Sequence, residues 1–153
     1  MKWLEHRIPP PIVLLITAAM MWIIARTTYV APLNQGIRYV TTAILFVIGV
    51  SVVLLAMFRF RRAGTTINPV EIERASSLVT SGIFQLTRNP MYLGLCIVLT
   101  GVAVLLSAPW ALLGLAIFVL FISRFQIQPE EGAMRTRFGN AYDEYCRRTR
   151  RWI

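Results

Sequence analysis

Three long stretches without a charged residue dominate the chain. They cover residues 8–25, 39–58 and 89–123, and their lengths are 18, 20 and 35 residues. A helix that crosses a bilayer needs about 20 apolar residues, because an ionised side chain at mid-membrane costs roughly 2.5 to 3.5 kcal/mol. The first two stretches therefore predict single transmembrane helices, and the third predicts a hairpin of two helices.

The predicted hairpin turns within residues 107–110, where Pro109 cannot continue a helix and Trp110 suits a membrane interface. At about 1.5 Å per residue the third stretch measures about 52 Å, whereas two full crossings need about 60 Å. Either the last helix continues past Arg124, whose long side chain reaches the interface, or the hairpin is shallow. We expect an all-α integral membrane protein with about four transmembrane helices, of which the last two form a tight hairpin.

The composition supports a membrane protein and one domain. Of the 153 residues, 56% are hydrophobic and only 15% are charged, against about 25% charged in soluble domains. We expect a single membrane domain over residues 1–153, with two spans in 1–58 and a loop, the hairpin and C-terminal helices in 59–153. This leaves no room for a Rossmann-type cofactor domain. Cys96 and Cys146 lie in different environments, so neither a disulfide nor a metal site is predicted.

The positive charge is one-sided along the chain. With four spans and both termini inside, 14 of the 16 Lys and Arg residues lie on the cytoplasmic face, as the positive-inside rule requires. We expect a multi-pass protein of a bacterial-type inner membrane or an equivalent membrane, with lipid partners and no nucleic acid. The arginines near the C-terminus are interpreted as a lipid-headgroup contact: Arg147, Arg148, Arg150 and Arg151.

The two predicted cytoplasmic segments, 59–88 and 124–153, hold most of the residues with chemical potential. Within the first, residues 71–78 predict a short helix. Five side chains of segment 59–88 are too apolar for a solvated loop, and we expect them to lie against the membrane face or fold over the helix bundle. They are Leu78, Val79, Ile83, Phe84 and Leu86.

The segment 88–94, with sequence RNPMYLG, opens the predicted hairpin. A structural interpretation makes Asn89 the N-cap and Pro90 the first helical residue, with Gly94 and Gly101 on one seam of small residues. A functional interpretation uses the same geometry. A helix N-terminus flanked by an arginine and a tyrosine can hold an anionic or hydrogen-bonding ligand.

The segment 128–131, with sequence QPEE, follows the last apolar stretch. Proline and acids in a first turn are typical of a helix start. Paired acids at the bilayer exit, in an otherwise basic tail, can also anchor a cationic group. Three arginines lie close enough in sequence to pair with them: Arg124, Arg135 and Arg137.

An aromatic cluster follows in residues 138–145. Gly139 is expected to close one helix and Asn140 to cap the next. Tyr142 and Tyr145 are three residues apart and so share a helix face, with Phe138 one turn earlier. Such a face is more often packing than a ligand-stacking site.

Taken in order, these motifs resemble the isoprenylcysteine carboxyl methyltransferase family and its phospholipid methyltransferase relatives. The family pattern runs G-x-[YF], R-H-P-x-Y-x-G, a helical hairpin, E-E, F/Y-G-x-x-Y-x-x-Y and an R-W-I-like ending. Here it is matched by residues 82–84, 88–94, 130–131, 138–145 and 151–153. The resemblance covers roughly residues 64–153. Asn89 stands where the commonest family form has histidine, so a proton-relay role does not transfer.

The resemblance implies an integral-membrane methyltransferase that uses S-adenosylmethionine, bound in a cytoplasm-facing pocket and without a metal. Tyr92 would fix the methionyl end, Glu130 or Glu131 would pair with the amino group, and Phe138 and Tyr142 would cover the adenosine. The implied cofactor-binding residues are Phe84, Gln85, Leu86, Arg88, Asn89, Pro90, Tyr92, Gly94, Glu130, Glu131, Phe138 and Tyr142. The implied catalytic residues are Arg124, Arg137 and Glu131, with either arginine holding an attacking carboxylate.

The acceptor implied by this family is hydrophobic and enters sideways from the membrane. A prenylcysteine carboxylate, an amine headgroup and a small isoprenoid acid all remain open. An amine nucleophile needs a nearby base, for which the chain offers a carboxylate but no histidine at the motif, and this favours an acceptor that is already anionic. The alternative to an enzyme is a non-catalytic four-helix membrane protein whose basic tail binds anionic lipid.

Overall fold

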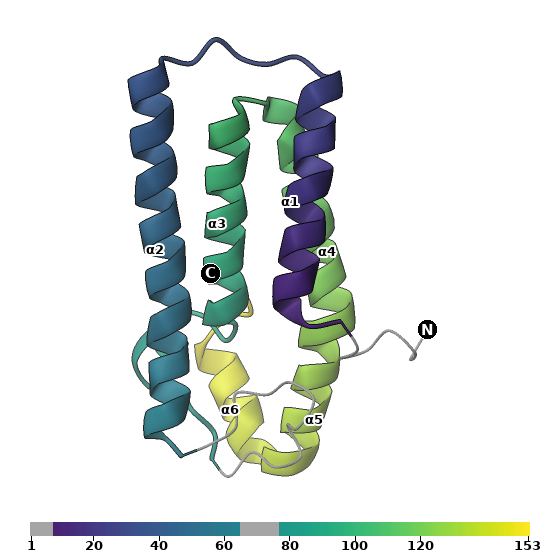
Figure 1. Ribbon diagram of the computed structural model, residues 1–153. Helices are drawn as coiled ribbons and strands as arrows, with labels where there is room; N and C mark the ends of the chain where they lie inside the picture. The colour runs from purple at the N-terminus through teal and green to yellow at the C-terminus, as the bar shows by residue number, and fades with distance from the viewer. Residues whose placement is uncertain (1–7, 65–76) are drawn as a thin grey trace.

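A computed structural model describes residues 8–64 and 77–153, and helices dominate this part of the chain (Figure 1). Four long helical segments run alternately up and down. Their bounds are α1 (Pro10–Thr27), α2 (Gln35–Arg62), α3 (Pro90–Leu106) and α4 (Leu112–Ile122), the last continuing through η5 (Ser123–Ile127) into α5 (Gln128–Phe138). The remaining elements are η3 (Gly82–Gln85), η4 (Pro109–Ala111) and α6 (Asn140–Arg148).

Among the described residues, three helical segments are long and apolar enough to cross a membrane: residues 10–27, 35–62 and 109–138. The fourth, α3, is a shorter apolar helix of 17 residues, about 25 Å long at 1.5 Å per residue. The prediction of an all-α integral membrane protein is confirmed. Of the two alternatives for the hairpin, the structure has the one in which the last helix runs on past Arg124.

The hairpin turns where the sequence predicts it. Ser107 ends α3 with a positive φ of 52°, and Pro109 then opens η4. The loop between α1 and α2 lies at the same end of the bundle, because the Ala31 amide donates a hydrogen bond of 2.7 Å to the Ser107 carbonyl. The described part of the α2–α3 connection, residues 77–89, lies at the opposite end together with α5 (Figure 1). This alternation agrees with the topology that the charge distribution predicts.

The predicted helix start at residues 128–131 is wrong in one respect, because the helix does not begin there. It passes without a break from α4 through the π-helical turn η5 into α5. Pro129 lacks an amide hydrogen, and its ring would clash with the carbonyl four residues earlier, at Phe125. Widening the turn at residues 123–127 relieves that clash. Glu130 and Glu131 still occupy the first turn of α5.

Small residues let α2 and α3 approach closely. A Cβ built on Gly94 would lie 2.6 Å from the Gly49 carbonyl oxygen, and one built on Gly49 would lie 2.7 Å from the Gly94 oxygen. Gly101, two turns further along α3, lies against Leu45 and Thr42. The predicted seam of Gly94 and Gly101 is confirmed, and Gly49 is its partner on α2.

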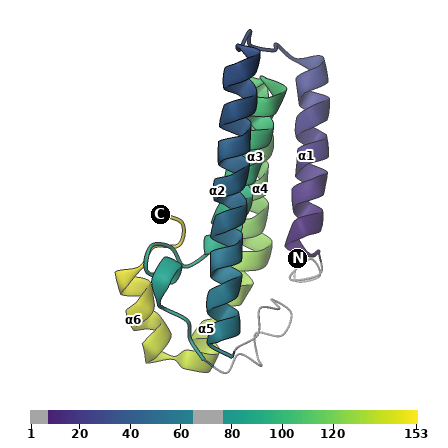
Figure 2. The ribbon, with the colours of Figure 1, turned by 60° about the vertical axis from the view of Figure 1, so that its left-hand side comes forward.

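In the part of the chain that the structure describes, the buried apolar residues form two clusters. One runs along the bundle and includes Tyr92, Phe118 and Ile122. The other lies beside the end of the bundle, where α6 and η3 pack together (Figure 2). The predicted packing of the loop is confirmed for Leu78, Val79, Ile83 and Phe84, which belong to this second cluster. Leu86 does not join them and is 74% exposed. The predicted helix at 71–78 falls mainly on residues outside the described part.

A sharp elbow at Gly139 joins α5 to α6. Gly139 has φ 52° and ψ −127°, and it is the N-cap of α6 as well as the C-cap of α5. The prediction that Asn140 caps α6 is therefore wrong, since Asn140 is the first residue of that helix. Arg135 and Asp143 form an ion pair of 2.9 Å across the elbow.

Candidate functional site

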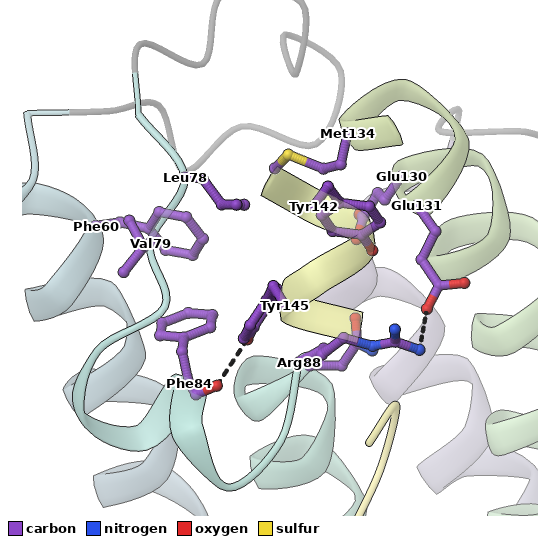
Figure 3. Close-up of a pocket in the computed structure, with 11 residues that line it drawn as sticks. Phe60, Leu78, Val79, Phe84, Arg88, Glu130, Glu131, Met134, Tyr142 and Tyr145 are labelled. Atoms are coloured by element: carbon purple, nitrogen blue, oxygen red, sulfur yellow. Dashed lines mark hydrogen bonds and ion pairs between the residues drawn. The ribbon is translucent and has the colours of Figure 1, made fainter. Parts of the chain in front are cut away.

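A pocket lies at the end of the bundle, between the end of α2, the loop before α3, α5 and α6 (Figure 3). Its volume is about 90 Å³, so a nucleoside-sized ligand enters only if the walls separate, since pockets for such ligands measure roughly 300 Å³ or more. Aromatic and apolar side chains form one part of the lining, and charged side chains form the other. The lining residues are Phe60, Leu78, Val79, Phe84, Arg88, Asn89, Glu130, Glu131, Met134, Tyr142 and Tyr145.

Glu131 is held by two arginines. Arg88 Nη2 lies 3.0 Å from Glu131 Oε1, while Arg151 donates from Nη2 to Oε2 at 2.6 Å and from Nε to Oε1 at 3.0 Å. The Arg88 and Glu131 side chains are only 13% and 15% exposed. The hydrogen bond to Glu131 raises the pKa of Arg151. The charge of Glu131 is therefore compensated within the protein.

Glu130 has a different environment from its neighbour. The Tyr92 hydroxyl donates a hydrogen bond of 2.5 Å to Glu130 Oε1. Within residues 8–64 and 77–153, no arginine forms an ion pair with Glu130. Burial disfavours a charged carboxylate that no cation compensates. A cationic ligand group in the pocket would supply that compensation.

Two aromatic pairs line the pocket and together form its aromatic wall. The Phe60 and Phe84 rings meet edge to face at 5.1 Å, and those of Tyr142 and Tyr145 at 6.3 Å. The Tyr145 hydroxyl donates a 2.7 Å hydrogen bond to the Phe84 carbonyl (Figure 3). Burial raises the pKa of both tyrosine hydroxyls, so they stay protonated as donors. The predicted common face of Tyr142 and Tyr145 is confirmed.

The Asn89 side chain does not cap α3, which corrects the sequence interpretation. Asn89 occupies the N-cap position, as predicted, and Pro90 is the first helical residue. However, Asn89 Nδ2 donates a 2.9 Å hydrogen bond to the carbonyl of Arg151. Asn89 therefore fastens the C-terminal segment to the wall of the pocket.

Arg88 has an unused donor. Its Nε is buried and has no hydrogen-bond partner within the part of the chain that the structure describes. A buried guanidinium nitrogen without a partner is costly, so it is a natural place for an acceptor atom of a ligand.

The structure brings together only part of the site that the sequence implies. Phe84, Arg88, Asn89, Glu130, Glu131 and Tyr142 line the pocket. Tyr92 reaches it through its hydrogen bond to Glu130. Phe138 packs against the second buried cluster, the one that contains Phe84 and Tyr142, and Pro90 is buried at the start of α3.

The other predicted site residues lie elsewhere. Gln85 and Leu86 are exposed, and Gly94 packs against α2. Arg124 is exposed, with Nη1 3.3 Å from Gln128 Oε1. Arg137 is also exposed, and its guanidinium lies 6.0 Å from the centre of the Phe138 ring. Neither arginine is among the residues that line the pocket.

Five lining residues were not singled out as site residues from the sequence: Phe60, Leu78, Val79, Met134 and Tyr145. Tyr145 stands in the aromatic motif and so carried a usable signal. Phe60 and Met134 stand in no motif, and only the pocket that α2 and α5 both line reveals them. Arg151, beside the pocket, stands in the C-terminal R-W-I motif.

Comparison with known proteins identifies similar chains. The sequence profile of a family described as phospholipid methyltransferase matches residues 37–141, more than half of the chain. An uncharacterized protein of Haemophilus influenzae is 40% identical over 63 residues, which are 41% of this chain and 100% of that protein. A probable protein-S-isoprenylcysteine O-methyltransferase of Oryza sativa subsp. indica is 32% identical over 108 residues, 69% of this chain and 55% of the relative.

A third relative is protein-S-isoprenylcysteine O-methyltransferase B of Arabidopsis thaliana, which is 32% identical over 87 residues. That match covers 57% of this chain and 44% of the relative. The chain thus spans about half the length of the isoprenylcysteine methyltransferases that it matches.

Proposed function

Because the chain belongs to the phospholipid methyltransferase family, we propose that it transfers a methyl group from S-adenosylmethionine to a hydrophobic acceptor in the membrane. The acceptor class that we propose is a carboxylate such as that of an isoprenylcysteine-like group. The plant relatives are named for isoprenylcysteine as their substrate. The observation that carries the proposal is Glu130, a half-buried acid without a pairing arginine among the described residues, in a pocket with an aromatic wall.

The residues of the pocket fit the chemistry of this cofactor. Its ammonium group would pair with Glu130, and its carboxylate would accept from the unused Nε of Arg88. Its adenine would stack against the wall that contains Phe84 and Tyr142. These roles use one anionic side chain, one cationic side chain and one aromatic surface, which match the ammonium, the carboxylate and the adenine of the cofactor.

The cofactor supplies an electrophilic methyl group when it is bound. The protein would contribute orientation and exclusion of water, because an anionic acceptor and a cationic donor lose charge as they react. Aromatic and apolar side chains at the pocket, such as Phe60, Val79 and Met134, would keep water away from the reacting atoms. No general base is needed for an acceptor that is already ionised.

Phosphatidylethanolamine-type amines are the second acceptor class, since the family description itself names phospholipids. An amine nucleophile has to lose a proton during the reaction. Asn89 cannot take it, and its side chain is already bound to the C-terminal segment. This favours the carboxylate acceptor.

The charge distribution supports an orientation with the pocket on the cytoplasmic side. The α2–α3 connection, α5 and α6 share the end of the bundle that carries most of the arginines. A lipophilic acceptor would reach this end from the bilayer. A bacterial inner membrane or an equivalent membrane is the proposed location.

A binding experiment tests the proposal. Purified full-length chain in detergent is titrated with S-adenosylmethionine by calorimetry, with adenosine and methionine as separate probes. We expect saturable binding to the whole cofactor and much weaker binding to either half. Absence of binding at millimolar cofactor, in a sample whose circular dichroism shows intact helices, would refute the enzyme and leave the non-catalytic lipid-binding protein.

An acceptor assay then separates the two substrate classes. Transfer of a radiolabelled methyl group is followed to a farnesylcysteine carboxylate and to phosphatidylethanolamine in the same mixed micelles. We expect base-labile product, as a methyl ester gives, from the carboxylate. Base-stable product from phosphatidylethanolamine alone would assign the second class instead.

A further inference from the structure

Two residues of the C-terminal segment, Arg150 and Arg151, are fastened by their backbone carbonyls to the loop that precedes α3. The Arg88 amide donates to the Arg150 carbonyl at 3.0 Å. The Thr87 hydroxyl and Asn89 Nδ2 donate to the Arg151 carbonyl at 3.2 and 2.9 Å. Trp152 then packs against the core of the bundle. Three consecutive residues of the loop before α3, which we call the pocket loop, therefore bind the C-terminal segment: Thr87, Arg88 and Asn89.

These backbone hydrogen bonds, which we call the clasp, place the Arg151 side chain beside Glu131 at the edge of the pocket. Arg151 makes two hydrogen bonds to Glu131, from Nε at 3.0 Å and from Nη2 at 2.6 Å. A planar guanidinium that meets both oxygens of a carboxylate fixes the orientation of that carboxylate as well as its charge. Arg88 reaches the same acid from the other element, at 3.0 Å. Glu131 is thus the point where α5, the pocket loop and the C-terminal segment meet.

The neighbouring acid explains why this arrangement matters. Glu130 and Glu131 are adjacent in α5, and both line the pocket. If Glu131 were less well neutralised, its negative charge would disfavour the ionised form of Glu130. It would also draw the Arg88 guanidinium more tightly toward itself, away from a ligand. Arg151 would limit both effects without lining the pocket.

We propose that Arg151 is a positioning residue for the pocket, which acts through Glu131 to keep Glu130 and Arg88 available for a zwitterionic ligand. This inference rests on the proposed function, because the ligand that it concerns is the cofactor. It assigns separate roles to the two acids. Glu131 organises the protein, and Glu130 meets the ligand.

The test compares variants of the full-length chain for their affinity for S-adenosylmethionine. R151Q should weaken binding about fivefold, a modest effect because the Arg151 side chain is 39% exposed. It should raise the KM for the cofactor while kcat stays within about twofold. R150Q is the matched control, since Arg150 is exposed and contributes its backbone carbonyl to the clasp. Its affinity should match that of the wild type.

A second background shows whether the effect passes through Glu131. In E131Q the charge that Arg151 neutralises is gone, so adding R151Q should change the affinity by less than about twofold. R151K keeps the charge but loses the bidentate geometry, so its affinity for the cofactor should lie between those of the wild type and R151Q. It also serves as the test variant if R151Q does not fold.

Each outcome decides the question. If R151Q binds the cofactor as tightly as R150Q does, the inference is overturned and the proposed function stays intact. If R151Q does not fold, R151K takes its place in this comparison. The same holds if R151Q weakens binding equally with Glu131 and with Gln at that position. If the folded wild type binds no cofactor, the proposed function fails, and the positioning role falls with it.

Discussion

Tyr92 and Glu130 are joined by a hydrogen bond of 2.5 Å between residues 38 positions apart in the chain. Tyr92 belongs to the first turn of α3 and Glu130 to the first turn of α5, so the bond links the two arms of the hairpin at the pocket. The tyrosine fixes the acid without compensating its charge. This combination of a fixed position and an uncompensated charge is what a cation-binding group requires.

Replacement of Glu130 by Gln should weaken the binding of S-adenosylmethionine by roughly tenfold or more. A charge-assisted hydrogen bond contributes about 1.5 to 3 kcal/mol, and the amide keeps the shape but loses the charge. Calorimetric titration of purified protein measures the effect. Glu144→Gln is the control, because Glu144 pairs with Arg147 and Arg148 on the outer side of α6. Equal binding by the two variants would remove Glu130 from the proposed site.

Replacement of Tyr92 by Phe tests the orientation of that acid. Loss of one hydrogen bond to a charged group should raise the cofactor KM by about threefold to tenfold, with little change in the helical content. Tyr29→Phe, in the exposed loop at the opposite end, provides a comparison. Steady-state kinetics at saturating acceptor measure the cofactor KM of both variants, and only Tyr92→Phe should raise it. A Tyr92→Phe enzyme with unaltered KM would show that the hydrogen bond from Tyr92 does not orient Glu130 for the ligand.

Local patterns were enough to predict the long helices of the fold and the turn of the hairpin. Stretches free of charge predicted the helices, Pro109 marked the turn of the hairpin, and the spacing of Gly94 and Gly101 predicted a packing seam. Each of these signals depends on neighbours within a few residues. The π-helical turn before Pro129 was missed, because the sequence shows that a proline is present but not whether the helix bends, breaks or widens.

The site was predicted less completely, for a physical reason. Asn89 was expected to cap its own helix, yet its side chain bonds to a carbonyl 62 residues away. Arg124 and Arg137 were chosen for their proximity in sequence to the paired acids, but their helix turns both side chains outward. The arginines that reach Glu131 come from other segments, at positions 88 and 151. Such partners are determined by tertiary packing, which a local pattern does not contain.

Gly94→Ala should destabilise the protein by about 1 to 3 kcal/mol, because the new methyl group would overlap the Gly49 carbonyl. The matched control is Gly132→Ala on α5, where a Cβ meets nothing within 4 Å. That change should be neutral or stabilise the helix by up to about 1 kcal/mol. Thermal unfolding in detergent, at one scan rate for all samples, compares the two. Equal midpoints would contradict the close α2–α3 contact.

Gly139→Ala should loosen the aromatic wall of the pocket. Gly139 has φ 52° and ψ −127°, a conformation that is open to glycine and strained for other residues by about 1 to 3 kcal/mol. Relief of the strain would rotate α6, which carries Tyr142 and Tyr145, away from Phe84. We expect a lower unfolding midpoint and weaker cofactor binding together. Gly139→Asn should behave in the same way, because asparagine tolerates the left-handed helical region but not this one. If either variant keeps both the wild-type midpoint and the wild-type affinity, the elbow does not position the aromatic wall.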